Sequence, residues 1–304
     1  GNWTEGLTAY LADHLFKEME GTGAEYRKEM LARYRNYVSE GNDFPLARFT
    51  SRNSAASQAV GYGKTLMVWH MLRIKIGDEL FLEGLRRLYS EYLFKRASFA
   101  DIAALFSEVA ATDLEPFFDQ WVNRTGAPAL SISVDEASDN QARIMFAQIQ
   151  PEQPYDLKVP VALFYEGADG PEIYDVEISQ KAQGVLAGDY ASLNAVLVDP
   201  YFDVFRSLDR EETPPTVGEL FGASEIAFVL PDSDREHWSR LAESFGAGLN
   251  AEVLIASELD ELPADKAVWL LGRDNSFAAV LAEQVEQYGA DISMTAVGLP
   301  DSAL

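Results

Sequence analysis

The spacing of apolar residues changes twice along this chain, at Pro128 and again near residues 209–215. Before Pro128 they recur every three or four positions, as on one face of a helix. After Pro128 they alternate with polar residues, which is typical of half-buried strands. Beyond the charged, proline-containing segment 209–215, which predicts a stiff linker, apolar runs alternate with helix-like stretches. The sequence therefore predicts three domains, at residues 1–127, 128–208 and 209–304.

The first domain is expected to be helical. The apolar positions expected on one face of its first helix are Leu7, Leu11, Leu15 and Met19. Further helices are expected at 59–76, 79–93, 98–110 and 114–122. Gly77 should end the first of these, because glycine is typical just after a helix. Ser98 and Asp101 have the spacing of a capping box, and Asp113 is the expected cap of the last helix.

The second domain has the pattern of an antiparallel β-sandwich. Strands are expected at 130–134, 143–149, 157–165, 173–178 and 195–198. Short strands separated by turn residues, such as those at 139–140 and 167–170, favour a sandwich. We expect this domain to pack against its neighbours and to carry no chemistry of its own.

The third domain is predicted to be a Rossmann-like α/β domain. Strands are expected at 226–230, 253–255, 268–271 and 292–297, and helices at 233–245 and 275–288. The glycine-rich dinucleotide fingerprint does not follow the first strand; Pro231-Asp232-Ser233-Asp234 stands there instead. Acidic residues at a helix start disfavour a bound phosphate. An accessory role in packing, dimerisation or substrate shielding fits this domain better than dinucleotide binding.

Composition excludes several kinds of site and partner. The 49 acidic residues outnumber the 24 basic ones, for a net charge of −25. A surface this negative repels phosphate backbones, so nucleic acid is not an expected partner. The chain has no cysteine, which excludes disulfides, thiolate metal sites and cysteine nucleophiles. No apolar run reaches the roughly 20 residues that a membrane-spanning helix needs. The compartment is left open.

Two short segments carry the strongest functional signal. The pattern W-x-E-G-x-x-x-Y begins at Trp3 and includes Glu5, and Y-x-K begins at Tyr62. Three further segments follow in order: Gly77-Asp78-Glu79, the stretch 113–121 with its paired phenylalanines and tryptophan, and Gly126-Ala127-Pro128. Together these segments resemble the catalytic domain of the M1 family of zinc aminopeptidases over roughly the first 130 residues.

The resemblance implies specific roles. It makes Glu5 the third protein ligand of a catalytic zinc and gives the Tyr62 hydroxyl to the oxyanion of the tetrahedral intermediate. The family takes its other two ligands and its general base from H-E-x-x-H, and its amine-binding residues from G-x-M-E-N; both would fall before residue 1. The chain is thus expected to be the C-terminal part of an aminopeptidase that acts on peptides, with residues 1–127 the helical part of a thermolysin-like domain. Zinc is expected in the intact parent and not in this fragment, which should be inactive.

Other interpretations of the same residues stay open. Glu5 is also an ordinary acidic residue at a helix start, where the helix dipole favours it. Tyr62 is also a common kind of buried tyrosine, and Thr65 stands where the family usually has glycine. The segment 61–65 also resembles the end of a phosphate-binding loop, but this interpretation is rejected, because Gln58 occupies the position that requires glycine and no buried strand precedes the segment.

The histidines give no catalytic set. His14 and Glu18 form an i, i+4 pair that could bind metal, but no third ligand converges on them, and a chance surface pair is the simpler interpretation. His70, in an apolar helix, is expected to be a hydrogen-bonded packing residue. A glycyl aminopeptidase of the M61 type is a neighbouring possibility, but the Gly126-Ala127-Pro128 closure and the β-rich segment after it argue against that type. The rival function is a non-catalytic interaction or scaffold module derived from a metallopeptidase.

Overall fold

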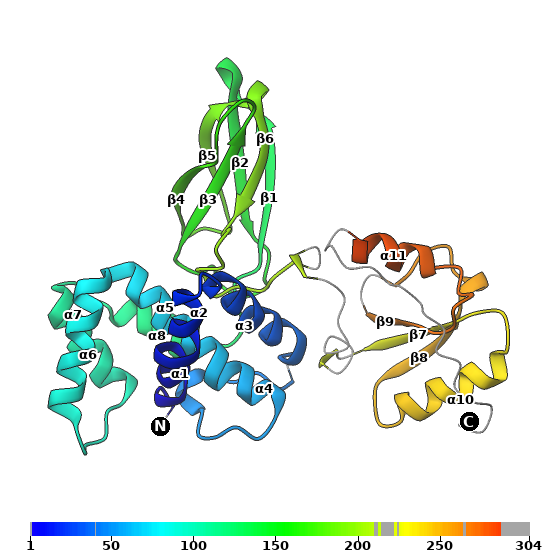
Figure 1. Ribbon diagram of the computed structural model, residues 1–304, viewed down its shortest axis with the longest axis horizontal. Helices are drawn as coiled ribbons and strands as arrows, with labels where there is room; N and C mark the ends of the chain where they lie inside the picture. Colours follow the sequence, from blue (N-terminus) through cyan, green and yellow to red (C-terminus); the bar gives the residue numbers. More distant parts are fainter. Residues whose placement is uncertain are drawn as a thin grey trace. The chain divides into compact units, whose positions relative to one another are not determined.

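The computed structural model describes residues 2–39, 41–209, 212–213, 222–223, 225–263 and 266–286. The chain divides into two compact units, Gly1–Leu208 and Asp209–Leu304, and each is described here by itself. The larger unit combines helices with two antiparallel sheets, and the smaller unit contains a parallel sheet (Figure 1). The predicted strand at 292–297 and the end of the predicted helix at 275–288 lie outside the described residues.

The first part of the larger unit is helical (Figure 1). Its α-helices are α1 Thr4–Ala9, α2 Leu15–Met19, α3 Gly23–Tyr37, α4 Ala55–Gln58, α5 Thr65–Ile76, α6 Asp78–Tyr92, α7 Phe99–Ala110 and α8 Glu115–Asn123. The shorter helices are η1 Tyr10–His14, η2 Leu46–Arg48 and η3 Ala59–Lys64. Both η1 and η3 are π turns inside continuous helices: η1 joins α1 to α2, and η3 joins α4 to α5.

The helix ends follow local sequence signals. Ser98 and Asp101 form the predicted capping box: the Asp101 carboxylate accepts from the Ser98 N–H at 2.7 Å, and the Ser98 hydroxyl accepts from the Asp101 N–H at 3.2 Å. Gly77, with φ of 85°, separates α5 from α6 as predicted. Asp113 lies one residue before the observed cap of α8, which is Leu114, and accepts from the Glu115 N–H at 2.9 Å.

The predicted apolar face of the first helix is wrong. Its buried positions are Gly6, Tyr10 and His14, and Leu7 is only partly buried against the core. The other three predicted core residues are exposed: Leu11, Leu15 and Met19, at 41, 40 and 79% of their surface. The inward side of this helix is determined by a close helix contact and by hydrogen bonds. A count of apolar residues detects neither.

Gly6 is needed because α1 crosses α5 very closely. A Cβ atom at position 6 would lie 2.3 Å from the Thr65 Cβ and 2.9 Å from the backbone nitrogen of Leu66. These separations are far below van der Waals contact, so any side chain at Gly6 would push the helices apart. The glycine of the W-x-E-G pattern therefore sets the distance between the helix that carries Glu5 and the helix that continues from Tyr62.

Two three-stranded antiparallel sheets complete the larger unit. The strands are β1 Leu130–Glu136, β2 Gln141–Gln148, β3 Leu157–Tyr165, β4 Glu172–Ile178, β5 Ala182–Asp189 and β6 Leu193–Val198. Their orders are β1-β2-β5 and β4-β3-β6. Alternate residues of β2 and β3, such as Ile144, Phe146, Val159 and Val161, are buried in the same apolar cluster as the helical core. Strand β5 was not predicted, because it contains two glycines and buries no side chain.

The segment after β6 returns to the helices and is fixed by buried charges. Asp199, fully buried with φ of 52°, accepts from Arg206 Nε at 3.0 Å and from the Asp203 N–H at 2.7 Å. The buried Arg27 guanidinium of α3 pairs with Asp203 at 2.9 Å and donates to the carbonyl oxygen of Tyr201 at 2.9 Å. Because an unpaired buried charge is costly, these contacts fix where the chain leaves the sheets.

The smaller unit contains a parallel sheet of order β8-β7-β9. Its elements are β7 Ile226–Leu230, α10 Arg235–Gly246, β8 Ala251–Ile255, η7 Ala256–Glu258, β9 Ala267–Leu270 and α11 Ala278–Glu286. Every residue of β7 is buried, as expected of a central parallel strand. The alternation of strand and helix agrees with the predicted α/β layer, and its Rossmann-like topology stays a prediction. Across the described residues, no helix has the length and apolarity to cross a bilayer.

We expect Gly6→Ala to destabilise the larger unit by about 1–3 kcal/mol, the usual cost of overpacking, although alanine favours helix formation. The measurement is urea unfolding. Gly63→Ala is the matched control, because a Cβ there meets only ordinary contacts, the nearest at 3.7 Å. Equal effects of the two substitutions would show that the α1–α5 crossing is not as close as described.

We expect the His14→Gln variant to lose less stability than the unsubstituted chain when the pH falls. Burial lowers the pKa of His14 to about 3 from its ordinary value of 6.5. Between these two pKa values, His14 is protonated in the unfolded chain and neutral in the folded chain. The contribution of His14 to the free energy of unfolding is therefore fully present above pH 6.5. It is lost on acidification, by up to about 1.4 kcal/mol per pH unit. Urea unfolding from neutral pH to about pH 4.5 measures the difference. His237→Gln, in the smaller unit, is the control, and an identical pH slope in His14→Gln would contradict the assignment.

Candidate active site

Glu5 lies in the first turn of α1, on its exposed side. Two contacts before the helix hold this turn: the Asn2 amide donates to the carbonyl oxygen of Ala47 at 3.1 Å, and the Trp3 indole N–H donates to that of Ala97 at 2.7 Å. The tryptophan of the W-x-E-G pattern therefore anchors the helix start to the loop between α6 and α7. The carboxylate beside it stays accessible.

Tyr62 lies in the π turn η3, within the otherwise buried start of the α5 helix. Its ring is half-buried between Phe49, whose ring centroid is 6.0 Å away at 81°, and the Arg52 guanidinium, 6.0 Å from the Tyr62 centroid. A Cβ at Gly61 would lie 2.1 Å from the Phe49 ring, so glycine is required there. π turns inside α-helices are frequent at functional sites, and here the turn aims the phenol.

The structure brings Glu5 and Tyr62 together. The Tyr62 pKa is raised, first by a hydrogen bond with the Glu5 carboxylate, then by burial and by the negative charge of Glu5. The positive charge of Arg52 opposes the shift. The phenol therefore stays protonated at neutral pH and is a hydrogen-bond donor. Their roles as zinc ligand and oxyanion donor stay predictions.

Arg52 was not singled out from the sequence. It lies in the irregular segment before α4, and among the described contacts its guanidinium lies over the Tyr62 ring. No spacing rule connects a loop arginine to a tyrosine in the next helix, so only the folded chain reveals it. Its position places one positive charge next to the Glu5–Tyr62 pair.

Lys64, the last residue of the Y-x-K pattern, does not join this pair. It is buried and donates to the carbonyl oxygen of Arg124, just after α8, at 2.8 Å. Its ammonium also lies 5.4 Å from the centroid of the Phe205 ring. Burial lowers the pKa of Lys64 to about 8, and the negative charge of Asp43 opposes this. Lys64 therefore fixes the π turn from the side away from solvent.

His14 is buried, which corrects the interpretation of His14 and Glu18 as a chance surface pair. Only 1% of the His14 side chain is exposed, and its Nε2 accepts from Arg27 Nη1 at 2.8 Å. The His14 Nδ1 lies 3.5 Å from Glu18 Oε2. The buried position and lowered pKa of this histidine indicate a neutral packing residue.

His70 is a hydrogen-bonded packing residue, as predicted. Its Nε2 donates to the Asp203 carboxylate at 2.8 Å, and its Nδ1 accepts from the Tyr10 hydroxyl at 3.2 Å. Burial is the largest cause of its lowered pKa. His14 and His70 rings lie 5.3 Å apart, but within the described part of the chain no three His, Cys, Asp or Glu side chains form a group that could hold a metal ion.

The residues present do not by themselves fit a catalytic zinc. Such sites use three protein ligands and an open position, whereas this pair offers one carboxylate, Glu5, beside a phenol. The donor type is suitable, because carboxylate oxygen is an ordinary zinc ligand. The number of donors is not suitable, because one carboxylate cannot hold a catalytic zinc alone.

Comparison with known proteins gives partial similarity to aminopeptidases. No protein-family model matches the chain. It is 30% identical over 82 residues to aminopeptidase N of Lactococcus lactis subsp. lactis, covering 27% of this chain and 10% of that protein. It is 23% identical over 118 residues to probable aminopeptidase 1 of Sulfurisphaera tokodaii and to leucyl aminopeptidase of Saccharolobus solfataricus, covering 39% of this chain and 15% of each.

Among solved structures, the chain is similar to Legionella pneumophila aminopeptidase A in complex with aspartic acid, with a TM-score of 0.45 and 15% identity, over 71% of this chain and 24% of that one. The chain spans only a tenth to about a seventh of the length of the curated relatives that it matches. The sequence similarities to several aminopeptidases support a relationship between this chain and a peptidase family.

Proposed function

We propose that this chain supplies one zinc ligand, Glu5, and one oxyanion donor, Tyr62, to the active site of a zinc-dependent aminopeptidase of the M1 type. The observation that carries the proposal is the approach of the Tyr62 phenol, from one helix, to the Glu5 carboxylate of another, close enough for the carboxylate to raise the pKa of the phenol. When a carboxylate and a protonated phenol lie in contact, the carboxylate can bind a cation while the phenol donates a hydrogen bond to a substrate oxygen. The partial similarity to aminopeptidases supports the peptidase assignment.

The remaining donors would come from polypeptide outside this sequence. Zinc bound there would polarise the substrate carbonyl and activate a water molecule. The substrates would be peptides, from which the N-terminal residue is removed. This chain alone, with one carboxylate donor, is expected to be inactive.

Tyr62 is suited to stabilise a developing oxyanion. Its raised pKa keeps the hydroxyl protonated, so that it can donate to an oxygen that becomes negative. The ring meets Phe49 edge to face and has the Arg52 guanidinium 6.0 Å from its centroid, which restricts the position of the phenol before substrate arrives. A donor held in place in this way needs little reorganisation when charge develops, and this is the source of its catalytic effect.

In this chain, Glu5→Gln should lower the Tyr62 pKa, because the substitution removes the negative charge and the charge-assisted hydrogen bond that favour the protonated phenol. The pKa is measured by NMR titration of tyrosine labelled at Cζ. Glu29→Gln is the control, because the Glu29 carboxylate is exposed on α3 and pairs with Arg33 at 2.5 Å. An unchanged Tyr62 titration in Glu5→Gln would sink the proposed pair.

In the intact parent protein, Tyr62→Phe should lower kcat by about 10²–10³ with a small effect on KM and on zinc content, since the hydroxyl acts chiefly in the transition state. Glu5→Gln should lower zinc content, measured by metal analysis after gel filtration. The control is Tyr89→Phe, because Tyr89 is 70% exposed on α6. A parent that neither binds zinc nor cleaves aminoacyl anilides would favour the non-catalytic interaction module instead.

A further inference from the structure

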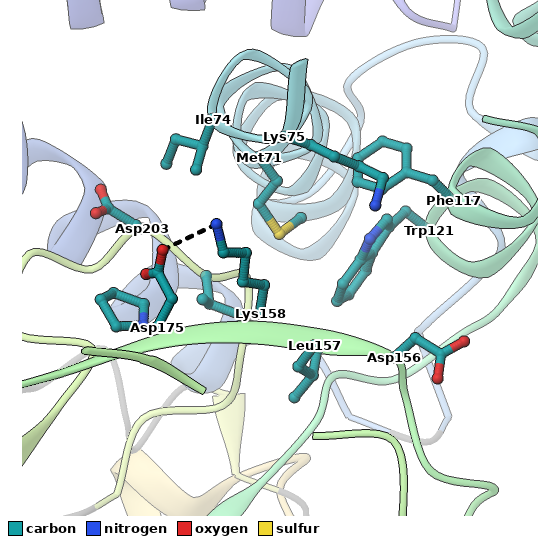
Figure 2. A pocket seen from close by; sticks show the side chains of 12 residues that line it. Met71, Ile74, Lys75, Phe117, Trp121, Asp156, Leu157, Lys158, Asp175 and Asp203 are labelled. Carbon is teal, nitrogen blue, oxygen red and sulfur yellow. Dashed lines mark ion pairs between the residues drawn. The ribbon is translucent and has the colours of Figure 1, made fainter. Parts of the chain in front are cut away.

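A small pocket opens where helices α5 and α8 meet strand β3 (Figure 2). Its volume is about 140 Å³. The buried residues that line it are Met71, Trp121, Leu157 and Val204. Apolar cavities of about 150 Å³ can hold a benzene molecule, so this pocket has room for one aromatic or branched side chain. It shares no residue with the Glu5–Tyr62 pair.

Two of the three carboxylates at this pocket are already neutralised. Asp175 pairs with Lys158 at 2.8 Å, shown by the dashed line in Figure 2. Asp203 pairs with the Arg27 guanidinium at 2.9 Å and accepts from His70 at 2.8 Å. A ligand in the pocket would therefore meet little net charge from either group.

The remaining charges are one cation and one anion. Lys75 and Asp156 are both exposed, and neither side chain has a hydrogen bond or ion pair with any other described residue. Figure 2 shows the indole of Trp121 between Lys75 and Asp156, with the Asp156 carboxylate on the side of the indole away from Met71. A simple carboxylate would be attracted by Lys75 and repelled by Asp156, and a simple amine the reverse. The charge pattern is complementary to a molecule that carries both groups.

We propose that this pocket binds a small zwitterion with one apolar side chain. The ligand carboxylate would pair with Lys75, its ammonium with Asp156, and its side chain would lie against Met71 and Trp121. A free apolar amino acid and a dipeptide share this chemistry. The site does not rest on the proposed peptidase function, because it uses neither Glu5 nor Tyr62 and needs no metal.

The first test compares ligands on the whole chain. Binding of L-leucine is followed through the NMR resonance of the Trp121 indole, up to about 10 mM, where even weak sites become occupied. Isocaproate lacks the ammonium and isoamylamine lacks the carboxylate; each should bind about 5- to 10-fold more weakly, the usual effect of losing one charge-assisted contact. Glycyl-L-leucine tells the two sources apart: tighter binding than leucine identifies a dipeptide site, and weaker binding an amino-acid site.

The second test pairs each ligand group with its proposed partner. Lys75→Met should weaken leucine about 5- to 10-fold and should not weaken isoamylamine, because that ligand has no carboxylate to lose and is no longer repelled by the ammonium. Asp156→Asn should weaken leucine and should not weaken isocaproate, for the corresponding reason. Lys95→Met is the control: it removes an exposed lysine that lines a separate apolar groove, beside Leu93 and Phe94.

A third variant separates loss of binding from loss of folding. Ile74 is 46% exposed at the pocket rim, so Ile74→Trp should block the entrance and abolish binding while the unfolding midpoint stays unchanged. The proposal is overturned if leucine causes no change at Trp121, if the three ligands bind equally, or if Lys75→Met binds leucine as the unsubstituted chain does.

Discussion

The guanidinium of Arg27 is the interaction on which the larger unit depends. It is 5% exposed and makes contacts to two other parts of the chain: the first helix at His14, and the return segment at the carbonyl oxygens of Tyr201 and Phe202 and at the Asp203 carboxylate. Asp203 in turn accepts from His70 of α5. One planar, always-charged group with several donors can satisfy all these acceptors at once, which lysine could not do.

The two π turns connect this buried network and the core to the candidate site. The turn η1 carries Tyr10 and His14 into the Arg27 network, and so fixes the helix that begins with Glu5. The turn η3 carries Tyr62 outward while Lys64, at its end, is held inside by the Arg124 carbonyl oxygen. Each turn places polar side chains inward, Tyr10 and His14 from η1 and Lys64 from η3, and these hold the nearby site residue at the surface. Rigid support of this kind is what a site for charge stabilisation needs.

How much the sequence predicted depended on whether local signals decided the outcome. Strand β3 and the capping box of Ser98 and Asp101 were found, because alternation and cap spacing act over a few residues. The inward face of the first helix was missed, because Gly6 and His14 face inward for a close helix crossing and for a hydrogen bond with a residue of another helix. The pattern of hydrophobic residues along one helix reveals neither the close crossing nor the hydrogen bond.

The candidate site shows the same division. Glu5 and Tyr62 could be named because the short patterns that contain them resemble those of a known enzyme family. Their contact depends on the separation of α1 and α5, which Gly6 and Thr65 set. It also depends on the edge-to-face contact of Phe49 with the Tyr62 ring and on the Arg52 guanidinium near that ring. Such contacts join segments from different parts of the chain, so they follow from the fold and not from any one window of sequence.

The distribution of charge constrains what this surface can bind. Among the described residues, three cations but only one carboxylate are buried: Arg27, Lys64 and Arg206 against Asp199. Basic residues that are already scarce are thus used inside, and the exterior is more acidic than the net charge of −25 suggests. An exposed cation next to a site, such as Arg52 or Lys75, is therefore a positive charge on a mostly negative surface. Because exposed charges are screened within about 10 Å at ordinary salt, such a cation attracts only anionic groups that come close to it.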